Sequence, residues 1–211
     1  MSNPTAAAAV SSASASSASF NIPQINKPLK ALGDDIWTNK TAKINAELFT
    51  LTYGSIVAQL CHDYKRDFKR VNEKLFQMGY NIGNRIIEDF LARTALPRCY
   101  TLETMGEVLS KVAFKIFLNI TPKYKISNNN NDLILTLGEN PLSDFVELPS
   151  DAMKDLWYSN ILCGVLKGAL EMVQLDCQVE FLSDMLRGDS STEIRIFSLK
   201  LLKDEIPAGE D

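Results

Sequence analysis

The sequence has a single histidine, His62, and four cysteines among its 211 residues. One imidazole excludes zinc sites that need two or three histidines, and it excludes every histidine cluster. The cysteines stand at positions 61, 99, 163 and 177 without a C-x-x-C pair, which favours reduced thiols over a disulfide framework. His62 follows Cys61 directly, and because adjacent helical residues point about 100° apart, the two do not suit a cysteine–histidine nucleophile.

The chain also lacks an excess of positive charge, a long apolar run and a glycine-rich phosphate loop. Its 22 Lys and Arg stand against 26 Asp and Glu, and the net charge of −4 argues against a nucleic-acid partner. No segment reaches the ~18 consecutive apolar residues of a transmembrane helix. The N-terminal residues have neither the basic start nor the apolar stretch of a signal peptide. We therefore expect a cytoplasmic protein without a metal or nucleotide cofactor.

Residues 1–28 are predicted to be a disordered tail and linker. Positions 2–19 contain 14 Ser or Ala, which bury too little apolar surface to offset the entropy of ordering the chain. Pro23 and Pro28 extend this segment. The remaining residues, 29–211, are predicted to form one domain.

Within the predicted domain, helical periodicity comes first and strand alternation later. Apolar spacings of three and four predict helices over 32–37, 49–64, 68–78, 82–91 and 101–119, with Gly79 ending the third. Period-two alternation predicts strands over 123–127, 133–137, 176–181 and 192–201, with a further helix over 155–172. This order predicts an α+β fold in which helices pack on a twisted four-stranded antiparallel sheet.

The helix over 101–119 is expected to be largely buried, because apolar residues cover more than half of its circumference. Thr101 is placed to cap its start. Its apolar residues are Met105, Val108, Leu109, Val112, Ala113, Ile116 and Phe117.

Cys99 differs from the other cysteines because it lies in a loop, between two apolar helices and beside Arg98. We expect the neighbouring cation to lower the pKa of this thiol and so to raise its thiolate fraction. The other three cysteines fall within helix or strand patterns, where an inert buried thiol is typical. A purely structural role for Cys99 fits the pattern equally well.

Two charged regions have a functional interpretation beside an ordinary one. Arg98, Lys111 and Lys115 suggest a basic patch, in which each cation contributes ~1 kcal/mol to binding an anionic leaflet. A solvated helix face explains them equally well, because two glutamates share the stripe. The acidic segment 203–211 is typical of a frayed end, or of a tail whose carboxylates enter a partner's phosphate or magnesium site.

A set of motifs spread over residues 29–211 is recognisable as a whole. The motifs are ELFTLTYG at 47–54, MGYNIG at 78–83, IEDFLAR at 87–93, NPL at 140–142, DFVELP at 144–149, YSN at 158–160, GALEMV at 168–173, RGD at 187–189, TEIR at 192–195 and IPAGE at 206–210. Through them the chain resembles the TRAPP subunit 3 (Bet-three) family of vesicle-tethering proteins. It departs from the family pattern at 123–131, where KYKIS and four Asn replace an Asn-Trp-containing loop.

The resemblance implies a Bet-three-like α+β domain that serves as a non-catalytic core subunit in ER-to-Golgi vesicle transport. Such subunits dimerise through their helices with paralogous Bet-three-like subunits, or with themselves when isolated, and longin-type subunits bind alongside. The assembly promotes guanine-nucleotide exchange on a Rab-type small GTPase. A peripheral location at the cis-Golgi and on ER-derived vesicles follows from this resemblance.

The resemblance also implies roles for individual residues. Cys99 matches a cysteine that carries a palmitoyl-type acyl chain inside an apolar tunnel. The seven apolar residues from Met105 to Phe117 match the tunnel wall, with Ala113 near its mouth, and the three basic residues match a membrane-facing surface. The tail residues expected to reach the nucleotide pocket of the GTPase are Glu205, Ile206, Pro207, Gly209 and Glu210.

Two alternative functions remain open. Cys99 can act as the nucleophile of an acyl-transfer enzyme or thioesterase, although no base lies near it in sequence. Alternatively, the same apolar tunnel can belong to a soluble lipid-binding protein whose ligand is held without a covalent bond.

Overall fold

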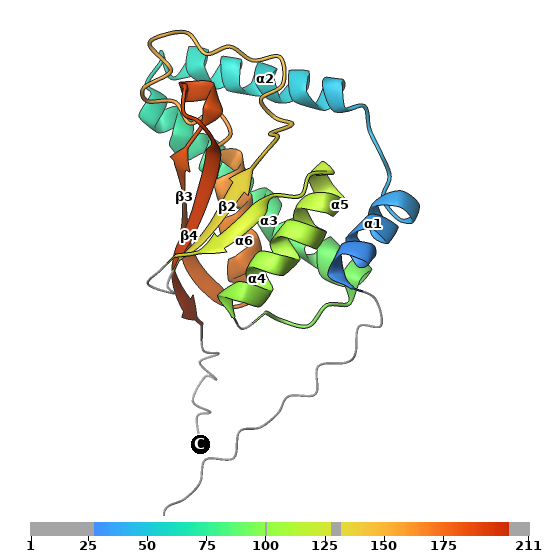
Figure 1. Ribbon diagram of the computed structural model, residues 1–211. Coiled ribbons are helices and arrows are strands. Elements are labelled where there is room, and N and C mark those ends of the chain that lie inside the picture. The colour runs from blue at the N-terminus through green and yellow to red at the C-terminus, as the bar shows by residue number, and fades with distance from the viewer. Residues whose placement is uncertain (1–27, 100, 128–131, 203–211) are drawn as a thin grey trace, which may run out of the picture.

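The computed structural model describes residues 28–99, 101–127 and 132–202. Its helices are α1 (Leu29–Asn39), α2 (Ala46–Asp63), α3 (Phe68–Thr94), α4 (Leu102–Val108), α5 (Phe114–Leu118) and α6 (Ile161–Met172). Its strands are β1 (Lys123–Ile126), β2 (Leu133–Leu137), β3 (Leu175–Ser183) and β4 (Thr192–Leu201). Figure 1 shows the strands side by side at one flank of the molecule and α2 lying across one end. The predicted α+β fold is confirmed.

The four strands form one antiparallel sheet in the order β1-β2-β4-β3. One face of the sheet is apolar, and it packs against the helices. Leu133 and Leu135 of β2 are fully buried there, as are their neighbours Ile194 and Ile196 of β4. Successive side chains of a strand point to opposite faces, so the residues between them lie on the outer face.

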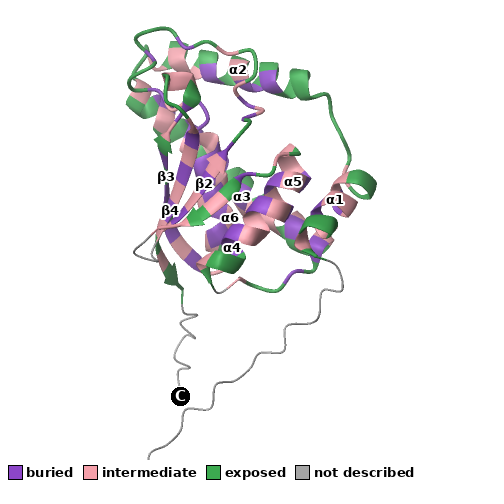
Figure 2. Cartoon of the chain, viewed as in Figure 1, coloured by how far each residue is buried: buried purple, intermediate pink, exposed green. Residues whose placement is uncertain are grey.

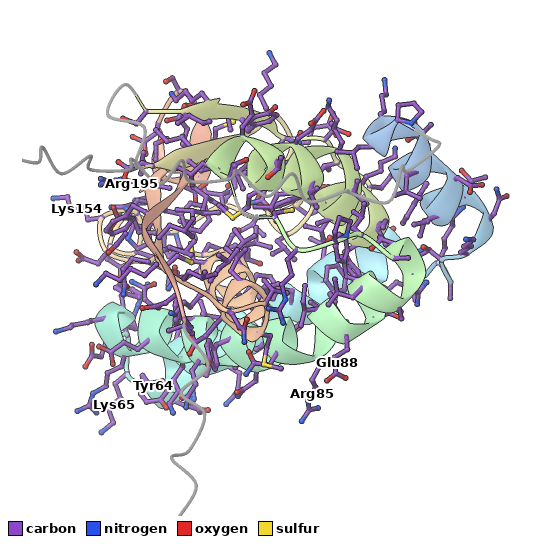
Figure 3. All side chains as sticks on the ribbon, turned by 90° about the horizontal axis from the view of Figure 1, so that it is seen from below. Tyr64, Lys65, Arg85, Glu88, Lys154 and Arg195 are labelled. Carbon is purple, nitrogen blue, oxygen red and sulfur yellow. The ribbon has the colours of Figure 1, made fainter. Side chains whose placement is uncertain are left out.

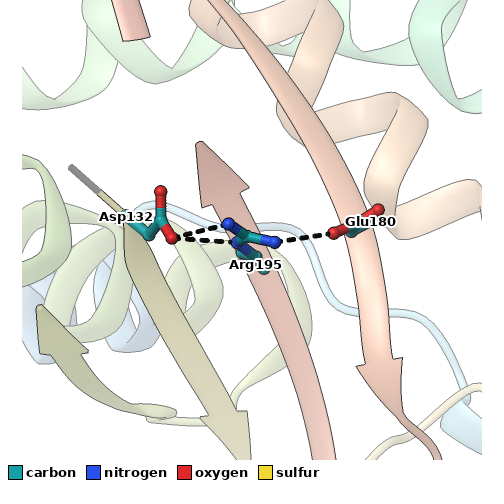
Figure 4. Close-up of polar contacts among 3 residues, drawn as sticks. All are labelled: Asp132, Glu180 and Arg195. Carbon is teal, nitrogen blue, oxygen red and sulfur yellow. Dashed lines mark hydrogen bonds and ion pairs between the residues drawn. The ribbon is translucent and has the colours of Figure 1, made fainter. Parts of the chain in front are cut away.

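The outer face of the sheet carries an ion network centred on Arg195 of β4. The Arg195 guanidinium donates to the Asp132 carboxylate at 2.7 and 3.0 Å and to the Glu180 carboxylate at 3.3 Å (Figure 4). It also lies 4.4 Å from the centre of the Phe197 ring. Partly exposed ion pairs contribute little to stability one by one, so this network chiefly orders the outer face across three strands.

Gly79 does not end a helix, which corrects the predicted stop: α3 runs without a break through this position. The glycine instead allows α6 to approach closely. A Cβ atom on Gly79 would clash with the carbonyl oxygen of Ile161, and a Cβ atom on Gly164 would clash with that of Phe76. Gly83 and the glycine at 168 repeat the contact along the two helices. The glycine spacing therefore marks a helix crossing.

The predicted helix over 101–119 is present, but a π-helical turn at Leu109–Ala113 interrupts it. Thr101 caps its start as predicted and accepts a hydrogen bond from a backbone N–H of the first turn at 3.2 Å. The Phe114 N–H bonds to the carbonyl five residues earlier, which defines the π turn. α1 packs against this turn so closely that a Cβ atom on Gly33 would clash with the Lys111 carbonyl oxygen.

The longest helix, α3, has a charged outer side. Figure 3 shows Arg85 and Glu88 projecting from α3 away from the rest of the molecule. Across the described ranges, no helix combines the length and the apolar character that crossing a bilayer requires. The helix predicted over 155–172 begins only at Ile161, because residues 149–160 form turns and irregular chain.

Candidate functional site

An apolar cavity of about 500 Å³ lies between the helices. Its walls come from α2, α3, the chain that follows α3, the α4–α5 region and α6, so segments far apart in the sequence surround it. The volume falls within the ~300–1,000 Å³ range of ligand pockets. Typical lining residues are Ile56 of α2, Ile86 of α3, Phe117 of α5 and Leu166 of α6.

Five of the seven residues predicted to line a tunnel do line this cavity: Met105, Val108, Leu109, Ala113 and Phe117. The prediction is wrong for Val112 and Ile116. Both are fully buried in a second apolar cluster, together with Ile36 of α1 and Phe90 of α3. Because the helix is apolar nearly all round, it meets the cavity on one side and α1 on the other.

Sequence reasoning missed the part of the wall that α3 and α6 provide. Ile82 of α3 and Val165 and Ala169 of α6 all line the cavity. The apolar character of α6 is visible in the sequence. Hydrophobic periodicity, however, shows that a helix is buried without showing which of its sides borders a cavity.

The π-helical turn contributes directly to the cavity wall. Leu109 and Ala113 stand at its two ends and line the cavity, as does Phe114 just after it. A π turn widens the helix locally and so changes which of the following side chains face the cavity. Turns of this kind occur frequently at functional sites.

Cys99 lies on the cavity wall and is partly buried. Burial raises the pKa of its thiol, and a hydrogen bond with the Thr104 side chain opposes this rise. The predicted lowering of the pKa by Arg98 is wrong, because the Arg98 guanidinium donates to the side chain of Gln174 instead. The Cys99 thiol is therefore predominantly protonated at neutral pH.

Cys99 is the sole cysteine among the described residues of the cavity wall. Cys163 and Cys177 are buried elsewhere, and burial raises the pKa of Cys177 to about 11. Cys61 and the exposed His62 lie at the end of α2, outside the cavity. Among its described residues, the wall contains no His, Asp or Glu.

The three basic residues predicted to face a membrane each have a polar partner. Arg98 reaches the turn before β3, and Lys111 bonds to Glu107 one turn earlier on the same helix. Lys115 lies 3.6 Å from the carboxylate of Asp34 on α1. These contacts tie the cations to neighbouring elements, and their role at a membrane stays a prediction.

Several predicted segments lie outside the described residues. They are 1–27 of the N-terminal tail, 128–131 of the divergent hairpin, and the C-terminal segment that contains Glu205, Ile206, Pro207, Gly209 and Glu210. Their predicted roles, including the contact of the C-terminal tail with a GTPase, stay predictions.

The cavity wall between α2 and α3 is partly open to solvent. Phe49 and Ile56 of α2 and Ile82 and Leu91 of α3 line the cavity, and yet 37–43% of each residue is exposed. Figure 2 shows α2 largely exposed along its length. Apolar side chains gathered at an exposed surface are typical of a site that another protein covers.

The chain has close relatives of known family. Residues 49–197 match the family model described as Transport protein particle (TRAPP) component. The chain is 70% identical over 187 residues to Trafficking protein particle complex subunit BET3 of Saccharomyces cerevisiae, across 88% of this chain and 97% of the relative. It is 56% identical over 181 residues to Transport protein particle subunit bet3 of Schizosaccharomyces pombe, across 85% of this chain and 97% of the relative.

A solved structure is similar as well. It is the crystal structure of a trafficking protein particle complex subunit 3 from Naegleria fowleri covalently bound to palmitic acid. The two chains share 41% sequence identity with a TM-score of 0.72, over 77% of this chain and 100% of the other. The likeness therefore extends from sequence to three-dimensional structure.

Proposed function

The chain belongs to the TRAPP component family, and on that premise we propose that it is a core subunit of the TRAPP vesicle-tethering complex with an acyl chain on Cys99. The complex acts in ER-to-Golgi transport and promotes nucleotide exchange on a Rab-type GTPase, to which this chain contributes structure rather than a catalytic centre. The observation that carries the proposal is the apolar cavity with Cys99 on its wall. The palmitic acid bound covalently to the similar Naegleria fowleri protein supports it.

An acyl chain in this cavity becomes part of the protein core. A palmitoyl chain has about 14 methylenes, and at ~0.8 kcal/mol each their burial contributes on the order of 11 kcal/mol. This is comparable with the net stability of a whole domain, about 5–15 kcal/mol. A chain buried in this way does not insert into a bilayer, so membrane contact falls to surface residues such as Arg98, Lys111 and Lys115.

The surroundings of Cys99 favour a stable thioester over enzymatic turnover. When the thioester forms, the Sγ–acyl bond is made, the carbon–sulfur bond of an acyl-thioester donor breaks, and the thiol proton leaves with the donor's thiol. Hydrolysis then needs a base that activates water. The described cavity wall holds no His, Asp or Glu, and burial raises the pKa of Tyr53, which lines it, so these residues argue against the acyl-transfer enzyme.

The exposed part of the cavity wall supports a partner subunit. We infer that a paralogous Bet-three-like subunit covers Phe49, Ile56, Ile82 and Leu91, and that a second copy does so in the isolated protein. Longin-type subunits and the GTPase complete the assembly. The GTPase contacts this chain through the tail at 205–210. The complex works peripherally at the cis-Golgi and on ER-derived vesicles.

Intact-protein mass spectrometry tests the acylation. Protein from a eukaryotic host is measured before and after hydroxylamine, which cleaves thioesters, beside the variants Cys99→Ser and Cys61→Ser. We expect an acyl-sized mass that hydroxylamine removes from the wild type and from the Cys61→Ser control, and that Cys99→Ser lacks. A wild type without this mass contradicts the acylation.

The same preparations separate the alternative functions. Organic extraction without thioester cleavage recovers an intact ligand only if the protein binds lipid reversibly. Release of acyl groups over many turnovers occurs only if the protein is an enzyme. A single stable adduct on Cys99 excludes both alternatives.

A protein that ends at Lys203 tests the role of the C-terminal tail. Complexes assembled with this shortened chain and with the full chain are compared for nucleotide release from the Rab-type GTPase. We expect several-fold slower exchange, because Glu210 and its neighbours no longer reach the nucleotide pocket. Equal rates in a fully assembled complex refute the role of the tail and leave the acylation unaffected.

A further inference from the structure

Phe145 is an exposed aromatic residue in an unfavourable backbone conformation. It lies between β2 and α6, has a φ of 64° and is 77% exposed. The left-handed region is uncommon for residues other than glycine and is a genuine outlier for a bulky side chain. The ring gains little from packing, so its own contacts do not explain the conformation.

The backbone that leads into Phe145 is held firmly by hydrogen bonds at residues 140–143. The Thr50 hydroxyl of α2 donates to the Pro141 carbonyl at 2.7 Å, which attaches the segment to α2 (Figure 1). Asn140 is buried, and its amide donates to the Ser159 hydroxyl at 2.8 Å. The Ser143 N–H donates to the Asn140 carbonyl at 2.9 Å. The segment is therefore preorganised, with Phe145 held out to solvent.

Phe145 is the third residue of a turn in which the Val146 N–H donates to the Ser143 carbonyl at 3.3 Å, a position where a positive φ usually belongs to glycine or asparagine. Ala95 and Asn119 end helices in the left-handed conformation, which is a common helix cap. Gln174 lies in the tight turn between α6 and β3. Among the described residues with positive φ, Phe145 is the aromatic one, at which a large apolar ring is exposed.

Acidic residues flank the ring. Asp144 and Glu147 are both exposed, and neither forms an ion pair with a described residue. Two carboxylates beside an exposed ring are repelled by an anionic lipid surface, which argues against a membrane as the partner. They match the basic border of a protein pocket, because interfaces pair potentials of opposite sign.

We propose that Phe145 anchors a docking surface for another subunit of the TRAPP complex, whose matching site is an apolar pocket bordered by Lys or Arg. The proposal rests on the subunit role proposed above. A rigid aromatic residue that is held in place before binding loses little entropy on association, and such residues often dominate interface energy. The strained backbone then serves binding rather than folding.

The variant Phe145→Gly separates docking from folding, because glycine adopts a positive φ without strain. The probe is the assembly of the remaining TRAPP subunits of the same organism, purified without this chain and titrated with wild type or variant at fixed salt. We expect the variant to bind about tenfold more weakly or worse, with an unchanged or raised melting temperature. Met153→Ala, an exposed apolar residue of the same segment, is the matched control and should bind like the wild type.

A second variant tests the acidic border. Asp144→Lys combined with Glu147→Lys is expected to slow association and to weaken its dependence on salt, because rim charges act mainly on the association rate. The proposal is overturned if Phe145→Gly binds the assembly within twofold of the wild type, or if this variant has a lowered melting temperature. It is also overturned if the variant binds only a second copy of this chain more weakly. A wild type that fails to join the assembly overturns the subunit role itself, which distinguishes the two failures.

Discussion

Cys99 shows how the surroundings of a residue outweigh its neighbour in sequence. Arg98 precedes it directly, and yet the guanidinium turns to Gln174 while the thiol lies against apolar side chains of the cavity. Desolvation therefore dominates and raises the pKa of Cys99. The choice of Cys99 from four cysteines was possible from sequence, because it stands in a loop between apolar helices. The direction of its pKa shift could not be predicted from the sequence.

Asp184 is a buried carboxylic acid at the end of β3. Its Oδ1 accepts hydrogen bonds from the Leu186 N–H at 3.1 Å and the Thr192 hydroxyl at 3.4 Å, and its Oδ2 has no partner among the described residues. Desolvation raises the pKa of this carboxyl. The folded protein thus holds the proton more tightly than the unfolded chain. The resulting stability is full below the ordinary Asp pKa of about 3.9 and is lost as the pH rises through the raised value.

We predict that Asp184→Asn removes this loss of folding stability at rising pH. The amide keeps an oxygen for the two donors and does not ionise, so the stability of the variant should rise relative to the wild type as the pH rises above about 4. The slope of that difference is at most about 1.4 kcal/mol per pH unit. Urea unfolding at several pH values measures it, with the exposed Asp155→Asn as control. A difference that does not change with pH would contradict the prediction.

At the scale of elements, the contact between α3 and α6 depends on residues without side chains. Gly79 and Gly164 bring the two backbones together, so each carbonyl oxygen of the neighbouring helix occupies the space that a Cβ atom needs. Sequence reasoning interpreted Gly79 as a helix end, because glycine often stands there. The correct role requires knowledge of the helix on the other side.

We predict that Gly164→Ala destabilises the protein by about 3 kcal/mol, the upper end of the usual cost of overpacking. The intrinsic preference of alanine for a helix, about 1 kcal/mol over glycine, offsets only part of the clash with the Phe76 carbonyl. Gly138→Ala is the control, because nothing lies within 4 Å of its Cβ position. Chemical denaturation compares the two variants, and equal stabilities would show that the helices separate without cost.

At the scale of the whole molecule, the open cavity wall predicts association. Ile56→Glu places a charge on that wall, where 37% of the native residue is exposed. Because a partner must then bury an unpaired charge, we expect the dissociation constant of the isolated protein's dimer to rise about tenfold or more. Light scattering over a concentration series measures it. The control is Leu182→Glu, because native Leu182 is 42% exposed and lies outside the cavity wall. This control should leave the dissociation constant unchanged. If both variants raise the dissociation constant to a similar degree, the cavity wall is not the interface.

The order of helices and strands was determined by the sequence itself, because periodicities of 3.6 and 2 and the cap at Thr101 are local properties of the chain. Local pattern also set Cys99 apart as a loop thiol and marked the helix over 101–119 as apolar, whereas the expectation that this helix lines a tunnel came from the family resemblance. Only the tertiary structure decided which side of an apolar helix borders the cavity. The reason is physical: apolar residues cover most of this helix, so only the elements packed on it, among them Ile36 of α1 and Phe90 of α3, determine that Val112 and Ile116 do not line the cavity. The pKa of Cys99 depends on the same packing, and so does the interpretation of Gly79, since each is set by atoms distant in sequence.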